Sequence, residues 1–176
     1  AGLIIEAILE TKEAKQALFR ALEDVVAPDT ILASNTSSLS ITDIADGLRH
    51  GERVIGLHFF NPAPVMKLVE LVPHQHTSAA SLAHAGDWTK ACGKVVIACS
   101  DRPGFIVNRC ARPFYGEALA MLEEGRSASD IDASLLAAGY RIGPLSLIDL
   151  IGADINLAAT ESLAKAMDHH PRYSVY

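Results

Sequence analysis

The chain has 176 residues, of which 49% are hydrophobic and 20% charged, and its formal net charge is -6. This composition is typical of a globular protein with a buried core, and the length suggests one domain or two small ones. The sequence contains no uninterrupted apolar stretch of the ~18 residues that predict a membrane span, and no basic cluster that predicts binding to nucleic acid. Its three cysteines, an odd number without metal-ligand spacing, favour a reducing compartment, so we expect a cytoplasmic protein without membrane or nucleic-acid partners.

The chain begins with a predicted strand and a predicted helix. Residues 1–7 are mostly apolar and predict a buried strand, and residues 8–27 predict the helix that follows. Glu6 and Glu10 flank their junction, where a loop would open toward a bound ligand. Lys15 lies on the helix, and charged pairs three or four residues apart would equally suit a solvated face. A ligand contact and an ordinary charged surface therefore both remain open for Glu10 and Lys15.

A second short strand is predicted at residues 31–34, and four polar residues, Asn35-Thr36-Ser37-Ser38, follow it. Ser40, with Asp43 three residues later, has the spacing of a capping box and predicts a helix that starts near Ile41. One interpretation of the small polar residues at this point is therefore purely structural: they cap that helix.

The central stretch, residues 54–72, contains two apolar runs that flank Asn61-Pro62-Ala63-Pro64. Each run predicts a buried strand, and the proline-rich centre predicts their connection. If the runs fold back antiparallel about Pro64, His58 lies opposite Glu70, because both are equally far from that residue. Opposed residues on one face of a sheet have Cβ atoms about 5 Å apart. Glu70 could then accept the proton of one imidazole nitrogen and leave the other free as a base; the alternative is an edge histidine and a solvent-facing glutamate that never meet.

One more helix and one more strand complete the first half of the chain. They are predicted at residues 81–91, where Trp88 is expected to be a packing anchor, and at residues 95–99. His74 and His76 form a pair at close spacing but have no third ligand at metal-ligand spacing, so we predict no metal site.

From about residue 100 the pattern predicts helices alone. The predicted helices span residues 104–124, 130–138, 145–151 and 154–167. Pro113 predicts a kink in the first of them, and Asn108 lies one turn inside it, where a buried amide needs a partner. Apolar residues cover more than one face of residues 145–151, which indicates packing on a partner subunit. The expected fold class is α/β followed by all-α, with domains at residues 1–100 and 101–176.

Four blocks of sequence carry a resemblance to a known family. They are Ser34-Asn35-Thr36-Ser37-Ser38-Leu39, the run Leu57-His58-Phe59-Phe60-Asn61-Pro62 followed by Lys67-Leu68-Val69-Glu70, Pro103-Gly104-Phe105-Ile106-Val107-Asn108-Arg109, and Gly143-Pro144. In this order and spacing the chain resembles the 3-hydroxyacyl-CoA dehydrogenase family over nearly its whole length. The resemblance implies the C-terminal part of a Rossmann-type NAD-binding domain, followed by a helical dimerisation domain. Since no G-x-G-x-x-G turn of the kind that meets a pyrophosphate occurs in the sequence, we expect a fragment of a longer enzyme, truncated at the N-terminus. The resemblance implies a truncation at the C-terminus as well, because the closing segment usual in the family is missing.

The resemblance also implies roles for particular residues. His58 would be the catalytic base and Glu70 its partner, while Ser37 and Asn108 would hold the reacting oxygen of the substrate. Contacts with the cofactor NAD would come from Glu10, Lys15, Asn35, Ser37 and Asn61. The implied reaction is the NAD-dependent oxidation of a 3-hydroxyacyl-CoA to a 3-ketoacyl-CoA by a homodimer that binds an acyl-CoA. Two alternatives remain open: a dehydrogenase of a free hydroxy acid on the same scaffold, and an inactive fragment that only dimerises and holds a substrate.

Overall fold

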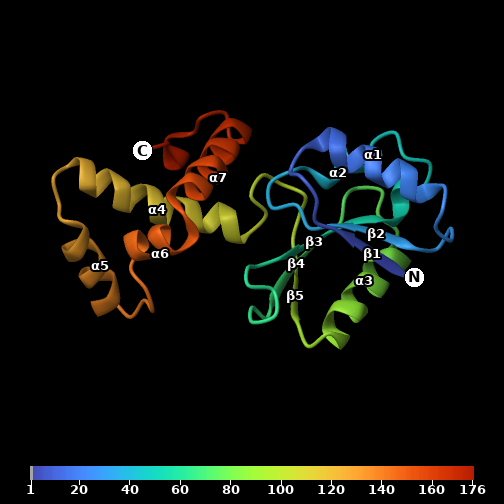
Figure 1. The fold of residues 1–176 in the computed structure, drawn as a ribbon, viewed down its shortest axis with the longest axis horizontal. Helices are drawn as coiled ribbons and strands as arrows, with labels where there is room; N and C mark the ends of the chain where they lie inside the picture. The colour runs from blue at the N-terminus through green and yellow to red at the C-terminus, as the bar shows by residue number, and fades with distance from the viewer. Residues whose placement is uncertain (1) are drawn as a thin grey trace. The chain divides into compact units, whose positions relative to one another are not determined.

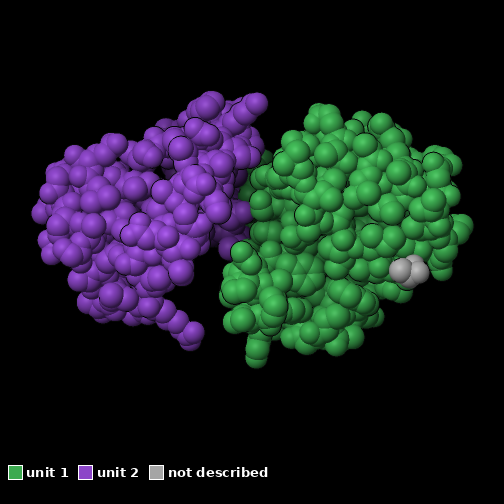
Figure 2. All heavy atoms as spheres, viewed as in Figure 1, with its two compact units in different colours: residues 1–106 green, residues 107–176 purple. Residues whose placement is uncertain are grey.

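The computed structural model describes residues 2–176, which divide into two compact units with the boundary between Ile106 and Val107 (Figures 1 and 2). Unit 1 contains β1 (Leu3–Glu6), α1 (Lys12–Glu23), β2 (Ile31–Ser34), α2 (Ile41–Ala45), β3 (Val54–Phe59), β4 (Leu68–Val72), α3 (Ala79–Ala91) and β5 (Val95–Ala98). Unit 2 contains α4 (Val107–Glu123), α5 (Ala128–Ala137), α6 (Pro144–Ile151) and α7 (Ala153–Ala166). The predicted fold class, α/β followed by all-α, is confirmed.

The sheet of unit 1 has the strand order β1-β2-β3-β4-β5. The first three strands are parallel, β3 and β4 form the expected antiparallel pair, and β5 runs parallel to β4. In that pair His58 lies opposite Glu70, as the symmetric spacing about Pro64 predicts. The carboxyl ends of β1, β2 and β3 meet at one edge of the sheet, which is where α/β proteins bind their ligands.

Helices cover both faces of this sheet, with α1 and α2 on one side and α3 on the other (Figure 1). Side chains alternate between the faces of a strand. Leu32, Val54 and Val72 accordingly pack with Phe19 of α1, in a core cluster that also holds Ile41 and Ile44 of α2. A second cluster joins Ile31, Ala33, Ile55, Leu57, Val69 and Leu71 to Ala85 of α3. His58 and Glu70 are even-numbered like Val54 and Val72, so they share the face covered by α1 and α2.

Gly56 of β3 lies in close contact with Ile41 of α2 and Val72 of β4. A Cβ atom built on it would lie 2.8 Å from Cβ of Val72 and 2.9 Å from Cδ1 of Ile41. Such separations do not occur between real Cβ atoms and carbon neighbours, so only glycine fits this position without displacement. The small residue lets α2 lie directly on β3, the strand that carries His58.

Unit 2 is held together in part by polar contacts between its helices. Asp132 of α5 caps the N-terminus of α6, because its carboxylate accepts the N–H groups of Leu145 and Ser146 at 3.0 and 2.9 Å. The buried Arg112 of α4 donates to Oδ1 of Asn156 in α7 at 2.8 Å. Within residues 2–176 no helix is both long and apolar enough to cross a membrane.

Several boundaries and one burial differ from the prediction. The first helix begins at Lys12 and not at residue 8, and α4 begins at Val107, so Asn108 lies in its first turn and not one turn inside. Pro113 lies inside this helix, where the prediction places it. Trp88 was expected to anchor the packing of α3, which is wrong: it is 37% exposed. Residue 1 of the first predicted strand lies outside the described residues.

Candidate active site

His58 and Glu70 form a buried hydrogen-bonded pair at the end of β3. The imidazole Nδ1 lies 2.6 Å from Oε2 of Glu70, and the two residues are 5% and 0% exposed. A carboxylate only accepts hydrogen bonds, so Nδ1 must be the donor and must carry a proton. The other ring nitrogen, Nε2, makes no hydrogen bond within the described part of the chain. In the neutral imidazole with its proton on Nδ1, Nε2 is therefore the nitrogen that can take up a proton.

A cavity of about 300 Å³ lies at the carboxyl ends of the three parallel strands. It is lined by Ala7, Ile8, Glu10, Lys15, Asn35, Ser37, His58 and Phe59. Five of these residues, from four separate segments, are among those that the sequence singles out. The fold thus brings Glu10, Lys15, Asn35, Ser37 and His58 together around one space.

Glu10 holds the polar loop that follows β2. Its Oε1 accepts the hydroxyl of Thr36 at 2.5 Å, the N–H of Ser37 at 2.9 Å and the hydroxyl of Ser38 at 3.3 Å. Burial opposes ionisation of this carboxyl, but the hydrogen bonds from Thr36 and Ser37, with the positive charge of Lys15, lower its pKa below the ordinary value. Glu10 is therefore held ionised, and it fixes the loop that presents Ser37 to the cavity.

Lys15 is almost completely buried, so the alternative of a solvated helix face is wrong for this residue. Its Nζ lies 2.9 Å from both carboxylate oxygens of Glu6 and 3.1 Å from Oε2 of Glu10. The hydroxyl of Ser34 also donates to Glu6. A buried charge needs such partners, because removing it from water without them costs on the order of several kcal/mol. The network ties the ends of β1 and β2 to α1 beneath the cavity.

The remaining residues singled out from the sequence differ in their placement. Asn35 links two strand ends, since its Oδ1 accepts the N–H of Phe59 at 2.8 Å; its NH₂ group makes no hydrogen bond among residues 2–176. Asn61 is exposed in the connection between β3 and β4 and does not line the cavity. Asn108 belongs to unit 2.

The cavity has walls that fit the nicotinamide end of a dinucleotide. Ile8 and Phe59 supply apolar surface for a flat ring, and the NH₂ of Asn35 is a donor for a carboxamide oxygen. Ligand pockets span about 300–1,000 Å³, and this cavity of about 300 Å³ lies at the lower end of that range.

The site contains contacts that the sequence patterns did not indicate. Oε1 of Glu70 accepts the N–H of Ile106 at 2.9 Å. The ring of His58 contacts those of Phe60 and Phe105, with centroid distances of 4.5 and 5.8 Å. The sequence places Glu6 at the junction of the first strand and the first helix, but it does not indicate the contact of Glu6 with Lys15. The run Pro103-Gly104-Phe105-Ile106 stood out in the sequence, but nothing in it indicated a contact with residues more than thirty positions earlier.

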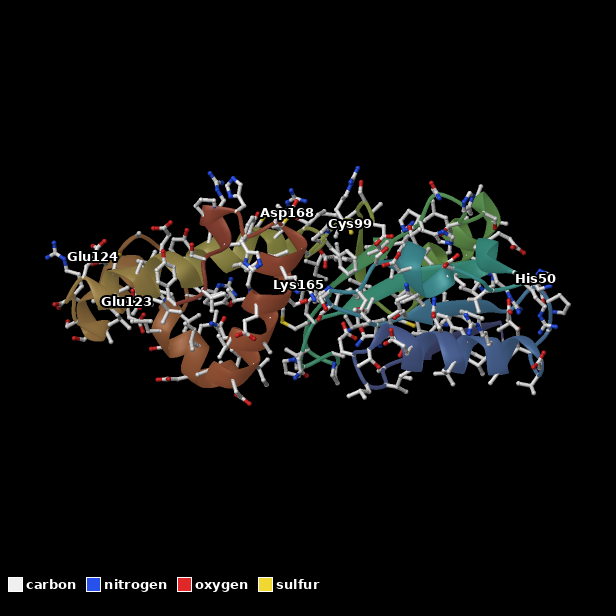
Figure 3. All side chains as sticks on the ribbon, turned by 90° about the horizontal axis from the view of Figure 1, so that it is seen from above. His50, Cys99, Glu123, Glu124, Lys165 and Asp168 are labelled. Carbon is white, nitrogen blue, oxygen red and sulfur yellow. The ribbon has the colours of Figure 1, made fainter. Side chains whose placement is uncertain are left out.

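Cys99, labelled in Figure 3, lies just after β5 and is buried. Burial raises the pKa of its thiol to about 12, and the negative charges of Glu70 and Asp101 act in the same direction. Cys99 is therefore a protonated thiol at neutral pH. Cys92 and Cys110 are both exposed free cysteines.

His74 has structural hydrogen bonds in place of the metal ligation considered for its pair with His76. Its Nε2 lies 2.9 Å from the carbonyl oxygen of Gly51, and its Nδ1 accepts the N–H of His76 at 3.4 Å. Both ring nitrogens of His74 are thus used within unit 1. Among the residues from 2 to 176, no group of three or more histidine, cysteine, aspartate or glutamate side chains is placed to hold a metal ion.

Comparison with known proteins gives matches over both units. A family model for the NAD binding domain of 3-hydroxyacyl-CoA dehydrogenase matches residues 1–102, and one for the C-terminal domain of the same enzyme matches residues 104–175. The chain is 50% identical to 3-hydroxyadipyl-CoA dehydrogenase of Escherichia coli K12, covering 98% of this chain and 37% of that protein. It is 47% identical to the human mitochondrial hydroxyacyl-coenzyme A dehydrogenase, covering 86% of this chain and 49% of that protein. The chain thus spans about half, or less, of the length of these relatives.

Solved structures agree with the sequence matches. A 3-hydroxybutyryl-CoA dehydrogenase from Escherichia coli K12 is similar with a TM-score of 0.96 and 50% identity, covering 99% of this chain and 38% of that chain. A (S)-3-hydroxybutyryl-CoA dehydrogenase from Ralstonia eutropha gives a TM-score of 0.94 and 40% identity, covering 99% and 62%. With family models matched across both units and this degree of identity, the chain belongs to the 3-hydroxyacyl-CoA dehydrogenase family.

Proposed function

We propose that the chain is part of an enzyme that oxidises a 3-hydroxyacyl-CoA to the 3-ketoacyl-CoA, with His58 as the general base. The observation that carries the proposal is the buried hydrogen bond between Nδ1 of His58 and Glu70, beside a cavity that His58 lines. An imidazole titrates near neutral pH and is a suitable acceptor for a hydroxyl proton. Nε2 takes that proton, and Glu70 stabilises the imidazolium that results, as an aspartate does in a serine-protease triad.

The neighbouring groups hold the substrate and exclude other orientations. Ser37, fixed by the hydrogen bond from its N–H to Glu10, donates its hydroxyl to the reacting oxygen, and Asn108 of unit 2 supplies a second donor. Donors aimed at this oxygen stabilise the negative charge that develops on it as its proton leaves. NAD, when bound, supplies the acceptor for the hydride.

Four other residues are proposed to hold the cofactor. The NH₂ of Asn35 donates to the nicotinamide carboxamide, and Lys15 and Glu10 form the floor on which the ring rests. Asn61, exposed in the β3–β4 connection, contacts the cofactor from outside the cavity. The match to an NAD binding domain over residues 1–102 supports this assignment.

Turnover by two forms of the protein tests the proposal. In the extended chain, a strand, a glycine-rich turn and a helix from another member of the family are fused to the N-terminus of this sequence. Reactive geometry requires atoms to be held within about 3.5 Å, and no glycine-rich pyrophosphate turn occurs in these 176 residues. We expect the extended chain to reduce NAD with 3-hydroxybutyryl-CoA and the 176-residue chain to show no measurable turnover.

The choice of substrate separates this function from its alternative. The same extended chain is assayed with free 3-hydroxybutyrate at equal concentration. A higher kcat/KM for the free acid than for the CoA ester would contradict the proposal and favour a hydroxy-acid dehydrogenase. Failure of both substrates, together with cofactor fluorescence that does not change when NADH is titrated, would favour a module that only dimerises and holds a substrate.

We further propose that the protein forms a homodimer through unit 2. Leu150 at the end of α6 and Ile155 and Leu157 at the start of α7 are 73%, 61% and 42% exposed. Exposed large apolar side chains, when they form one patch, mark interaction surfaces, and most homo-oligomers are two-fold symmetric dimers. Sedimentation velocity at micromolar concentration is expected to give a dimer, and Leu150→Lys with Ile155→Lys is expected to give a monomer. A wild-type chain that sediments only as a monomer would refute this expectation.

A further inference from the structure

A tight turn at Gly104-Phe105 lies against the His58–Glu70 pair. The two residues have φ angles of 71° and 46°, both in the left-handed region. Glycine adopts this conformation freely, but for a bulky residue such as phenylalanine it is uncommon and strained. Strain of this kind persists only where the surrounding structure holds the residue in place. The contacts that hold Phe105 therefore identify what the turn is built to position.

Phe105 is held by its side chain and by the residue after it. The ring is 4% exposed and belongs to the core cluster with Phe19 and Leu32. Its centroid lies 5.8 Å from that of the His58 ring. The next N–H, of Ile106, donates to Oε1 of Glu70 at 2.9 Å. The turn thus contacts both members of the pair, the histidine through a ring and the glutamate through the backbone.

The two contacts of the turn restrict the rotation of the Glu70 carboxylate and the tilt of the His58 ring. The carboxylate of a glutamate turns easily about its last torsion, whose preference is broad. Glu70 cannot turn freely, because Oε2 is bonded to Nδ1 of His58 and Oε1 to the amide of Ile106. Tilting of the imidazole is restricted by the rings of Phe105 and Phe60, whose centroids lie 5.8 and 4.5 Å from its own.

We propose that the turn is a positioning element for the base, in which Phe105 and the backbone amide of Ile106 fix the imidazole plane of His58 through its ring and through Glu70. The proposal rests on the proposed function of His58, and it assigns to Phe105 no contact with a substrate. The strained backbone of Phe105 is the consequence of placing its ring and the following N–H against two different residues at once.

The first test follows the proton on Nδ1 of His58 by NMR in the 176-residue chain, so that it does not depend on turnover. In Phe105→Leu the backbone and most of the apolar volume remain, but the flat ring is lost. We expect the exchange of this proton with solvent to be about tenfold faster, since exchange reports local opening of the hydrogen bond. Phe19→Leu is the matched control: it makes the same change in the same core cluster, and the proton should exchange as in the wild type.

A second change isolates the backbone contact. Replacing the amide of Ile106 by an ester removes its N–H and leaves every side chain in place, so it remains informative if Phe105→Leu does not fold. Faster exchange of the Nδ1 proton is again expected. In the extended chain Phe105→Leu should lower kcat about tenfold with little change in KM, since misplacement of reacting groups by 1 Å costs about 10²-fold and a looser imidazole is displaced by less than that.

The outcomes separate this proposal from the proposed function. Wild-type exchange in both the Phe105→Leu and ester forms would overturn the positioning role, as would equal acceleration in Phe19→Leu, which would indicate general loosening of the core. A third outcome is that His58→Gln leaves the activity of the extended chain unchanged while Phe105→Leu still accelerates exchange. The contact between the turn and the pair would then be real, but His58 would not be the base. The positioning role would be overturned because the proposed function on which it rests had failed.

Discussion

Replacing His58 by glutamine in the extended chain is expected to lower kcat for 3-hydroxybutyryl-CoA by about 10²- to 10⁴-fold, the usual contribution of general acid–base catalysis. Glutamine keeps a polar group near the position of the ring but cannot accept a proton from a hydroxyl. KM should change little, because the substrate is held mainly by other groups. Steady-state kinetics at saturating NAD measures both constants.

Glu70→Gln should be nearly as harmful. The glutamine would keep the size of Glu70 but not the charge that stabilises the imidazolium of His58. Its side-chain NH₂ could also face Nδ1, 2.6 Å away in the wild type, and hold the ring in the wrong tautomer. Wild-type kcat in the His58→Gln variant would remove the histidine from the mechanism, and wild-type kcat in Glu70→Gln alone would leave the histidine as a base that needs no charged partner.

Gly56→Val is expected to destabilise the folded chain by about 3 kcal/mol, at the upper end of what overpacking a core costs. The first added carbon would meet Val72 at 2.8 Å and Ile41 at 2.9 Å, and both neighbours are completely buried. Since a domain of this size is stable by only about 5–15 kcal/mol, much of the chain's stability would be lost. Urea unfolding, followed by circular dichroism, measures the change.

Gly86 of α3 is the matched control for this substitution. A Cβ atom there would meet only Cδ2 of Leu71, at 3.5 Å, which is an ordinary contact. Alanine favours a helix over glycine by about 1 kcal/mol, so Gly86→Ala should stabilise the chain while Gly56→Ala destabilises it. Equal effects of the two alanine substitutions would mean that the close approach at Gly56 does not limit the packing of α2.

The pairing of His58 with Glu70 could be predicted from the sequence because it depends on local geometry. Two apolar runs around a proline-rich centre are compatible with the antiparallel register that the structure shows, in which both side chains lie on one face. Spacing alone left an unpaired arrangement open, and the resemblance to the family favoured the pair. The alternation of helices and strands up to β5 likewise follows from periodicity. These parts of the fold are set by residues close together in the chain.

The features that could not be predicted depend on distant partners. The pattern places the start of the long helix at residue 104, but the N–H of Ile106 bonds Glu70, 36 residues away, and α4 begins only at Val107. The first helix begins late for a similar reason, since the N–H of Ile8 donates to Glu6 and Lys15 is drawn to the same carboxylate. No local pattern contains such contacts.

Trp88 shows the limit of reasoning from residue type. A lone tryptophan is expected to be buried, yet α3 packs on the sheet through small residues, among them Ser81, Ala85 and Gly86. These let the helix lie close to the strands, and the tryptophan lies on the exposed side. Size alone therefore did not indicate which face of α3 is the packed one.

The positions of the cysteines allow a spin label to be attached to each of the two units. Cys92 at the end of α3 and Cys110 in α4 are exposed, one in each unit, while the buried Cys99 has its thiol pKa raised to about 12 by burial and by nearby carboxylates. Thiolates are the form that reacts with maleimides, so the unmodified sequence accepts one spin label on each unit and none at the buried position. Pulsed electron resonance on the doubly labelled chain would then measure the distance between the sheet unit and the helical unit directly, with and without NAD.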